Sequence, residues 1–271
     1  MPTATVPARP PYRAAPYRPA PARAVAECLV MAGRSLRHIT RNPENLILAV
    51  VLPVMIMLLS VYILGGAMNV GRRYVDYVVP GIMLLCAGYG AALTAPVIAA
   101  DVRDGIVDRF RSLPVFPSAV LVGHVTASVA RNLLSTAMVI AVALLAGFRP
   151  AAGPGAWLAA LALLVLYITA VSWTALGLGL LARSVEAASG FGFVFLFLPY
   201  VSSGFVPPET MPTALRVIAE HQPITPITDT LRALFLGGSP GGDAALAVAW
   251  CAGLLAAGYG TGTLAFRRRS R

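Results

Sequence analysis

A short segment at residues 101–117 concentrates charged side chains in a chain that otherwise carries few of them. Charged residues make up 12% of the 271 residues, and hydrophobic residues make up 58%. Acidic and basic groups at this density form ion pairs and charge-assisted hydrogen bonds, which is the chemistry of docking to another protein. The segment is therefore predicted to be a docking element. Its charged members are Asp101, Arg103, Asp104, Asp108, Arg109 and Arg111.

Motifs for bond-making chemistry are missing or incomplete. A phosphate-binding P-loop needs a lysine, and all 21 basic residues are arginine. The chain has no HExxH zinc-protease motif, and Ser202-Ser203-Gly204 is a poor match to the GxSxG turn of a serine hydrolase. Cys28, Cys86 and Cys251 are isolated, without the spacing of a metal site or disulfide framework. We therefore expect no catalytic residue, no cofactor site and no metal site on this chain, and it is predicted not to be an enzyme.

The elements that position the charged segment are predicted to be membrane-spanning helices. A spanning helix needs about 20 mainly apolar residues. The predicted fold class is all-α, a polytopic membrane protein with six transmembrane helices, in which Pro53, Pro80, Pro96 and Pro199 predict kinks. The glycine pairs Gly177/Gly179, Gly190/Gly192 and Gly258/Gly260 lie within or at the end of the spans and predict close helix packing. The six spans cover approximately residues 45–66, 77–100, 119–147, 156–182, 187–206 and 243–264.

Two segments precede the first span. Residues 1–22 are rich in proline, alanine and arginine, which predicts a disordered cytoplasmic tail in front of a membrane domain at 23–271. Residues 23–41 sort apolar and charged side chains onto opposite sides of a helix, which predicts a helix lying in the membrane interface. The alternative is a soluble helix packed on its own domain. Asn42, Pro43 and Glu44 then have the residue types of a helix start.

A second group of short elements is predicted between the fifth and sixth spans. Pro212 begins a short helix that Pro223 ends, and another runs from about Ile227 to Leu236. Both are amphipathic. They would cover the outer end of a pathway or dip into the outer leaflet.

Arginine distribution predicts the orientation, because cytoplasmic loops are enriched in basic residues. Five arginines would lie outside the cell, at positions 72, 73, 149, 216 and 232, against fifteen inside. This places both termini and residues 101–117 in the cytoplasm. The fifteen are Arg9, Arg13, Arg18, Arg23, Arg34, Arg37, Arg41, Arg103, Arg109, Arg111, Arg183, Arg267, Arg268, Arg269 and Arg271. Because the arginines flank the apolar spans, the net charge of +10 indicates attraction to anionic lipid head groups rather than binding to nucleic acid.

Two features inside the spans leave alternatives open. Arg131 either reaches back to the inner interface or marks a polar pathway. Phe193, Phe197 and Tyr200 share one helix face, which suits either a flat, amphipathic substrate or packing against lipid or a second subunit.

Two stretches of this sequence resemble the permease subunit of type-2 ABC exporters, in the daunorubicin/doxorubicin-resistance branch. The first is Gly105-Ile-Val-Asp-Arg-Phe-Arg-Ser-Leu-Pro114, followed by Ser118-Ala-Val-Leu-Val-Gly-His124. The second runs from Phe205-Val-Pro-Pro-Glu-Thr-Met-Pro212 through Gln222-Pro-Ile-Thr-Pro226 to Leu231-Arg-Ala-Leu-Phe235. The resemblance extends from about residue 24 to the last span.

This resemblance implies a cytoplasmic coupling helix after the second span, outer re-entrant helices, and a separate ABC ATPase, with two copies of the ATPase and two of the permease. ATP would act only through that partner. If 102–113 is helical, its apolar residues share one face that could fill a groove of the ATPase, and its charges could fix the register. An ordinary positive-inside loop is the alternative, but it needs neither the acids nor the apolar stripe. The expected coupling residues are Val102, Arg103, Asp104, Ile106, Asp108, Arg109, Phe110, Arg111 and Leu113.

Three functions are compatible with these features. The first is the permease subunit of an ATP-driven exporter of a hydrophobic or amphipathic small molecule, such as an antibiotic, in the plasma membrane of a bacterium. The second keeps this machinery but exports a lipid, glycolipid or cell-wall polymer. The third is a non-transporting membrane scaffold that recruits a cytosolic partner.

Overall fold

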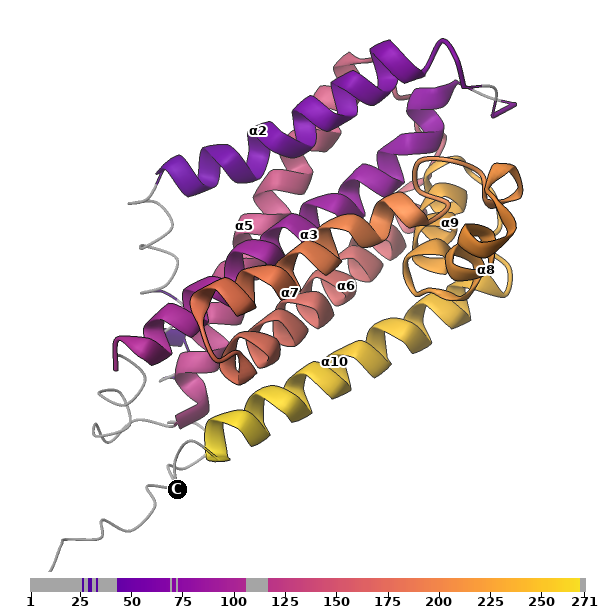
Figure 1. The fold of residues 1–271 in the computed structure, drawn as a ribbon. Helices are drawn as coiled ribbons and strands as arrows, with labels where there is room; N and C mark the ends of the chain where they lie inside the picture. The colour runs from indigo at the N-terminus through magenta and orange to yellow at the C-terminus, as the bar shows by residue number, and fades with distance from the viewer. Residues whose placement is uncertain are drawn as a thin grey trace, which may run out of the picture.

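The computed structural model describes residues 43–68, 70–71, 73–105 and 117–268, together with Ala26, Leu29, Val30 and Gly33. The described residues form an all-helical bundle (Figure 1). The predicted tail at 1–22 lies outside the described residues, and so does most of the predicted interfacial helix at 23–41.

Long helices make up most of the bundle. They are α2 (Pro43–Leu59), which continues as a π-helical turn (Ser60–Leu64), α3 (Tyr74–Arg103), α5 (Pro117–Leu145), α6 (Pro154–Leu181) and α10 (Asp243–Arg268). Their ends follow the sequence. Pro154 starts α6 directly after Gly153, and α5 ends before Gly147, whose φ of +99° suits glycine.

Within the described residues, five helices are long and apolar enough to cross a membrane, and they match five of the six predicted spans. The predicted span at 187–206 is shorter in the structure. It consists of α7 (Val185–Phe197) and a 3-10 turn (Leu198–Val201). Pro199 lies within this turn, where the chain leaves the helix. The count of six spans therefore stays a prediction.

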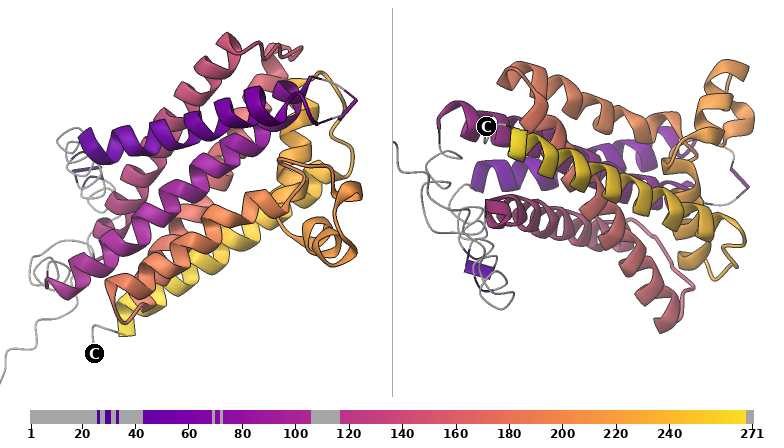
Figure 2. Two further views of the ribbon diagram at one scale, coloured as in Figure 1. Left: turned by 45° about the horizontal axis from the view of Figure 1, so that its top comes forward. Right: turned by 90° about the horizontal axis from the view of Figure 1, so that it is seen from below.

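The segment after α7 forms a compact unit, which we call the cap (residues 198–235). It contains the 3-10 turns Leu198–Val201 and Pro208–Thr210, α8 (Thr213–His221) and α9 (Ile224–Phe235). The predicted helix between Pro212 and Pro223 is confirmed as α8. The second helix begins three residues earlier than predicted, at Ile224. In Figures 1 and 2 the cap lies at one end of the bundle, which we call the cap end.

The opposite end of the bundle, the loop end, collects several chain segments. The start of α2, the end of α3, the start of α5 and the end of α10 all lie there (Figures 1 and 2). The charged segment connects α3 to α5 at this end. Each of the five long helices therefore runs between the two ends.

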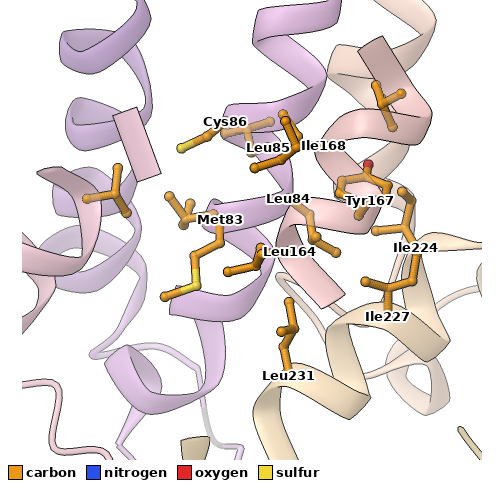
Figure 3. Packing of buried hydrophobic residues seen from close by; sticks show 14 of the residues in the cluster. Met83, Leu84, Leu85, Cys86, Leu164, Tyr167, Ile168, Ile224, Ile227 and Leu231 are labelled. Carbon is orange, nitrogen blue, oxygen red and sulfur yellow. The ribbon is translucent and has the colours of Figure 1, made fainter. Parts of the chain in front are cut away.

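Helix α3 is the centre of the packing. Of the most apolar stretch of α3, 72% is buried by the rest of the chain, compared with 22% for the span that contains α2 and 17% for α10. It packs against α2, α5, α6, α7 and α9. Figure 3 shows Met83, Leu84 and Leu85 of α3 beside Leu164 and Ile168 of α6 and the apolar side of α9. A displacement of α3 would therefore act on most of the bundle.

Glycines allow α3 and α6 to approach their neighbours closely. A Cβ atom added to Gly192 of α7 would lie 2.6 Å from the Cα atom of Ala92 on α3. A Cβ atom on Gly258 of α10 would lie 2.6 Å from the backbone nitrogen of Thr174 on α6. The predicted close packing is confirmed for Gly177, Gly179, Gly192 and Gly258, and it is wrong for Gly190 and Gly260, which face open space.

Candidate functional site

The charged segment begins as a direct extension of α3. Val102 and Arg103 form the last residues of that helix, and Asp104 and Gly105 form a turn. Gly105 has a φ of +69°, a conformation that ends a helix readily at glycine. The helix therefore ends at Arg103, so residues 102–113 do not form the single continuous helix considered from the sequence. Val102 also packs on the apolar cluster around Ile98, within the chain's own core.

The rest of the predicted coupling element cannot be placed in the same way. Ile106, Asp108, Arg109, Phe110, Arg111 and Leu113 lie outside the described residues. Among the described members, the guanidinium of Arg103 donates a hydrogen bond to the carboxylate of Asp104 at 3.0 Å, and both side chains are exposed. Their role in coupling stays a prediction.

A side-chain contact that sequence reasoning missed joins the helices on either side of this segment. Nε2 of His124, near the start of α5, lies 3.2 Å from Oδ2 of Asp101, near the end of α3. The two side chains are 22% and 24% exposed. The one available signal in the sequence was an acid at the end of one predicted span and a histidine near the start of the next.

Further into the bundle, buried hydroxyl groups connect three helices. Ser128 of α5 lies 3.0 Å from Thr94 of α3 and 2.9 Å from Ser172 of α6, measured between side-chain oxygens. Asn132 donates a hydrogen bond to the Ser128 carbonyl oxygen at 3.0 Å. In an apolar surrounding these groups are satisfied by each other and by backbone carbonyl oxygens, so the contacts of Ser128 fix the relative positions of α3, α5 and α6.

Arg131 adds a cation to this network. Its guanidinium donates a hydrogen bond to the hydroxyl of Thr94 at 3.2 Å. Arg131 lies seven residues beyond His124, which is about 10 Å farther along α5. Its Nε atom is buried and has no hydrogen-bond partner among the described residues. The side chain therefore reaches across to α3, and whether it serves a polar pathway stays open.

Two aromatic residues of α7 and one of the 3-10 turn after it form a continuous stripe, which we call the aromatic stripe on α7. The ring centroids of Phe193 and Phe197 are 6.5 Å apart, and those of Phe197 and Tyr200 are 6.2 Å apart. Tyr200 stacks on Phe205 of the cap at 4.5 Å. Phe193 and Phe197 are 57% and 59% exposed. The predicted shared face is therefore present and open, and its role as a substrate path stays a prediction.

At the cap end, Arg232 of α9 joins the cap to α3. Its guanidinium carbon lies 3.8 Å above the ring centre of Tyr77, and its nitrogens donate hydrogen bonds to the Tyr77 carbonyl oxygen at 3.2 Å. It also donates to the Ser203 carbonyl oxygen at 2.6 Å and forms an ion pair with Asp229. The Ser203 hydroxyl donates to the same carboxylate at 2.8 Å. We call this set the Arg232 cluster.

Electrostatics within the cluster are those of a partly buried ion pair. Burial raises the pKa of the Asp229 carboxyl above its ordinary value, while Arg232 and the Ser203 hydroxyl lower it and offset part of this effect. Sequence reasoning placed Arg232 only as an outer arginine. An acid three residues before an arginine on an amphipathic helix was the available signal.

Two further contacts hold the loop between α7 and α8 against α3. The Tyr74 hydroxyl donates to the Phe205 carbonyl oxygen at 3.0 Å. Gly81 and Gly204 meet closely, because a Cβ atom on Gly81 would lie 2.7 Å from the Gly204 Cα atom. The cap therefore packs directly on the N-terminal part of α3.

These features define a class: a helical membrane protein whose central helix joins a charged segment at one end to a cap at the other. The chain belongs to the ABC-2 type transporter family, whose sequence model matches residues 26–236. It is therefore a permease subunit, which associates with an ABC ATPase subunit and leaves ATP hydrolysis to that partner.

Curated relatives match most of the chain. The daunorubicin resistance ABC transporter permease protein DrrB1 of Streptomyces coeruleorubidus is 31% identical over 241 residues, which are 88% of this chain and 85% of the relative. The probable doxorubicin resistance ABC transporter permease protein DrrC of Mycobacterium tuberculosis (strain H37Rv) is 25% identical over 235 residues, which are 85% of this chain and 84% of the relative. The family and branch expected from the sequence motifs are therefore confirmed.

Proposed function

We propose that this chain is the transmembrane permease subunit of an ATP-driven exporter, and that it moves a hydrophobic or amphipathic drug or antibiotic out across the cell membrane. The observation that carries the proposal is the similarity of 88% of the chain to a permease named for daunorubicin resistance. The exposed aromatic stripe on α7 supports the cargo class, because flat aromatic compounds stack on such rings.

The continuity of α3 supports a route for mechanical work. One helix of 30 residues extends from the charged segment to the cap. The ATPase would bind residues 102–113 and, on closing, would displace α3 together with the helices that pack on it. Rigid-body movement of this kind switches a pathway between inward and outward access.

We further propose that two permease copies and two ATPase subunits form the transporter. Helix α2 exposes Ile47, Val51 and Met55, and α7 exposes Phe193 and Phe197. These faces would meet lipid or a second permease, either identical or different. The ATPase would bind and hydrolyse ATP, and no cofactor is assigned to this chain.

The proposed orientation puts the loop end in the cytoplasm and the cap outside. Arg103 ends α3 and Arg267 lies near the end of α10, and both of these helix ends lie at the loop end. Both termini would then be cytoplasmic, in the plasma membrane. This orientation brings the charged segment to the side where ATP is present.

An efflux assay with matched controls tests the proposal. The permease and its ATPase are produced together in a drug-sensitive bacterium, and intracellular daunorubicin is measured. The control strain carries an ATPase whose P-loop lysine is replaced. We expect lower accumulation only when both intact subunits are present.

Other outcomes separate the alternatives. An unchanged drug level, with an ATP-dependent change in the lipid composition of the outer leaflet, would replace drug cargo with lipid cargo. An ATPase that binds the permease but changes neither quantity would favour the scaffold.

A further inference from the structure

We propose that the Arg232 cluster is a latch that holds the cap closed on α3, and that each transport cycle releases it. The inference rests on the proposed function, because it assumes that ATP-driven movement of α3 opens the cap end. It assigns Arg232 a positioning role in transport.

The cluster concentrates polar contacts between α9 and α3 in one side chain. A single guanidinium contacts the ring and the carbonyl oxygen of Tyr77 on α3 and the carbonyl oxygen of Ser203 in the loop after α7. Arg232 and Asp229 both come from α9, so their ion pair moves with the cap. The contacts to Tyr77 are the polar contacts that must break if α3 and α9 separate, together with the apolar packing between these two helices.

The chemistry of the cluster favours a reversible contact. A cation over an aromatic ring is attracted through the ring quadrupole, without the interlocked side chains of an apolar core. When Arg232 leaves Tyr77, it keeps Asp229 as its counter-ion, so the released guanidinium is not left without a charge partner. The Arg232 side chain is only 11% exposed in this structure, so the latch is closed here.

Two neighbouring contacts also join α3 to the cap and would separate together with the Arg232 cluster. Gly81 and Gly204 approach through backbone atoms, and Tyr74 binds the cap through its hydroxyl. Both contacts lie on α3 near Tyr77, within about two turns of the same helix. Movement of α3 away from the cap would break all of them together.

Ser202 provides a reporter for opening. Its side chain is fully buried beside Ser203, and its hydroxyl donates to the Pro199 carbonyl oxygen at 2.6 Å. A Ser202→Cys substitution is small and keeps a weak hydrogen-bond donor. In a background where Cys28, Cys86 and Cys251 are replaced, labelling by a membrane-impermeant maleimide measures exposure of this position.

In the complex with the ATPase, we expect slow labelling of the Ser202→Cys reporter at rest and faster labelling when the ATPase is arrested with ATP and vanadate. Adding Arg232→Gln should raise labelling at rest by about tenfold, the factor expected when one buried charge-assisted contact is lost. Arg232→Lys should lie between, because an ammonium keeps the charge but loses the planar fork.

The matched control is Arg216→Gln. Arg216 also lies in the cap and forms an exposed ion pair with Glu220 of the same helix, at 2.7 Å. Among the described residues its ion pair lies within α8 and not against α3, so labelling should stay at the level of the unmodified chain.

The result that overturns the latch is equal protection of the reporter in Arg232→Gln and in the unmodified chain, at rest and with the ATPase arrested. If Arg232→Gln fails to reach the membrane, Arg232→Lys and Tyr77→Leu carry the test. Tyr77→Leu removes the ring and keeps the backbone acceptor. Labelling that neither variant raises also rejects the latch.

The labelling does not depend on cargo, so the two proposals fail separately. ATP-dependent labelling without daunorubicin efflux rejects the drug cargo and keeps the latch. Efflux with a reporter that stays protected throughout the cycle rejects the latch and keeps the exporter.

Discussion

His124 and Asp101 join the two edges of the charged segment, with 3.2 Å between Nε2 and Oδ2. The segment between them would therefore pull on α3 and α5 together. We expect His124→Ala to lower transport per ATP hydrolysed by roughly threefold, because a partly buried pair of this kind contributes on the order of 0.5–1 kcal/mol. Transport and ATP hydrolysis are measured on the same reconstituted complex.

Two controls test whether the pair itself matters. The exchange Asp101→His with His124→Asp should restore the ratio, because it keeps both partners. Arg216→Gln removes an exposed ion pair with Glu220 within α8, outside the coupling element, and should leave the ratio unchanged. An exchanged pair that performs no better than His124→Ala would rule out this role.

Phe110 is the predicted anchor of the coupling element, although it lies outside the described residues. We expect Phe110→Ala to reduce co-purification of the ATPase by about tenfold, since a buried aromatic anchor contributes about 1–2 kcal/mol or more to binding. The amount of permease in the membrane should stay the same. Recovery of the ATPase at the unmodified level, with normal transport, would count against the anchor.

The elements of the fold could be predicted because their signals are local. Apolar length predicts α2, α3, α5, α6 and α10, and proline or glycine fixes several ends, as Pro154 does for α6. The cap helices were also expected from their prolines. Helix α9 begins at Ile224, three residues before the predicted start near Ile227, because Pro226 lies in the first turn, where proline is tolerated.

Contacts between the helices could not be predicted in the same way. Asp101 and His124 are far apart in sequence, and Arg232 meets Tyr77 only because α9 packs on α3. Such pairs depend on how helices are placed and rotated, which periodicity does not determine. The same limit applies to Val102, which packs on the chain's own core although its spacing matched the predicted docking stripe.

The aromatic stripe on α7 gives a prediction about cargo. We expect Phe193→Ala combined with Phe197→Ala to reduce efflux of flat aromatic compounds by roughly tenfold, because stacking on each ring contributes about 0.5–1.5 kcal/mol. Efflux of an aliphatic amphiphile should change much less. Phe191→Ala is the control, since Phe191 is on α7 and 41% exposed but makes none of the stacking contacts of the stripe. A loss that is equal for both compounds would indicate a packing role.

Ser128 joins α3, α5 and α6 through its hydroxyl. We expect Ser128→Ala to lower the stability of the detergent-purified permease by about 1–2 kcal/mol, because hydrogen bonds between membrane helices contribute about 0.6–1.7 kcal/mol each. Thermal unfolding measures the change. Thr126→Ala is the matched control, since the Thr126 hydroxyl bonds only within α5, to the Val122 carbonyl oxygen at 2.8 Å. An equal effect of the two substitutions would contradict the role of the network.

The proposed topology places the loop end in the cytoplasm and the cap outside the cell. In a background without native cysteines, Ala214→Cys on the exposed surface of α8 should react with an impermeant maleimide in intact cells. Ser270→Cys, beside Arg269 in the tail, should react only after the cells are opened. The opposite pattern would put residues 101–117 on the side of the membrane that lacks ATP. A cytosolic ATPase could then no longer drive α3 through that segment, whichever side chains it carries.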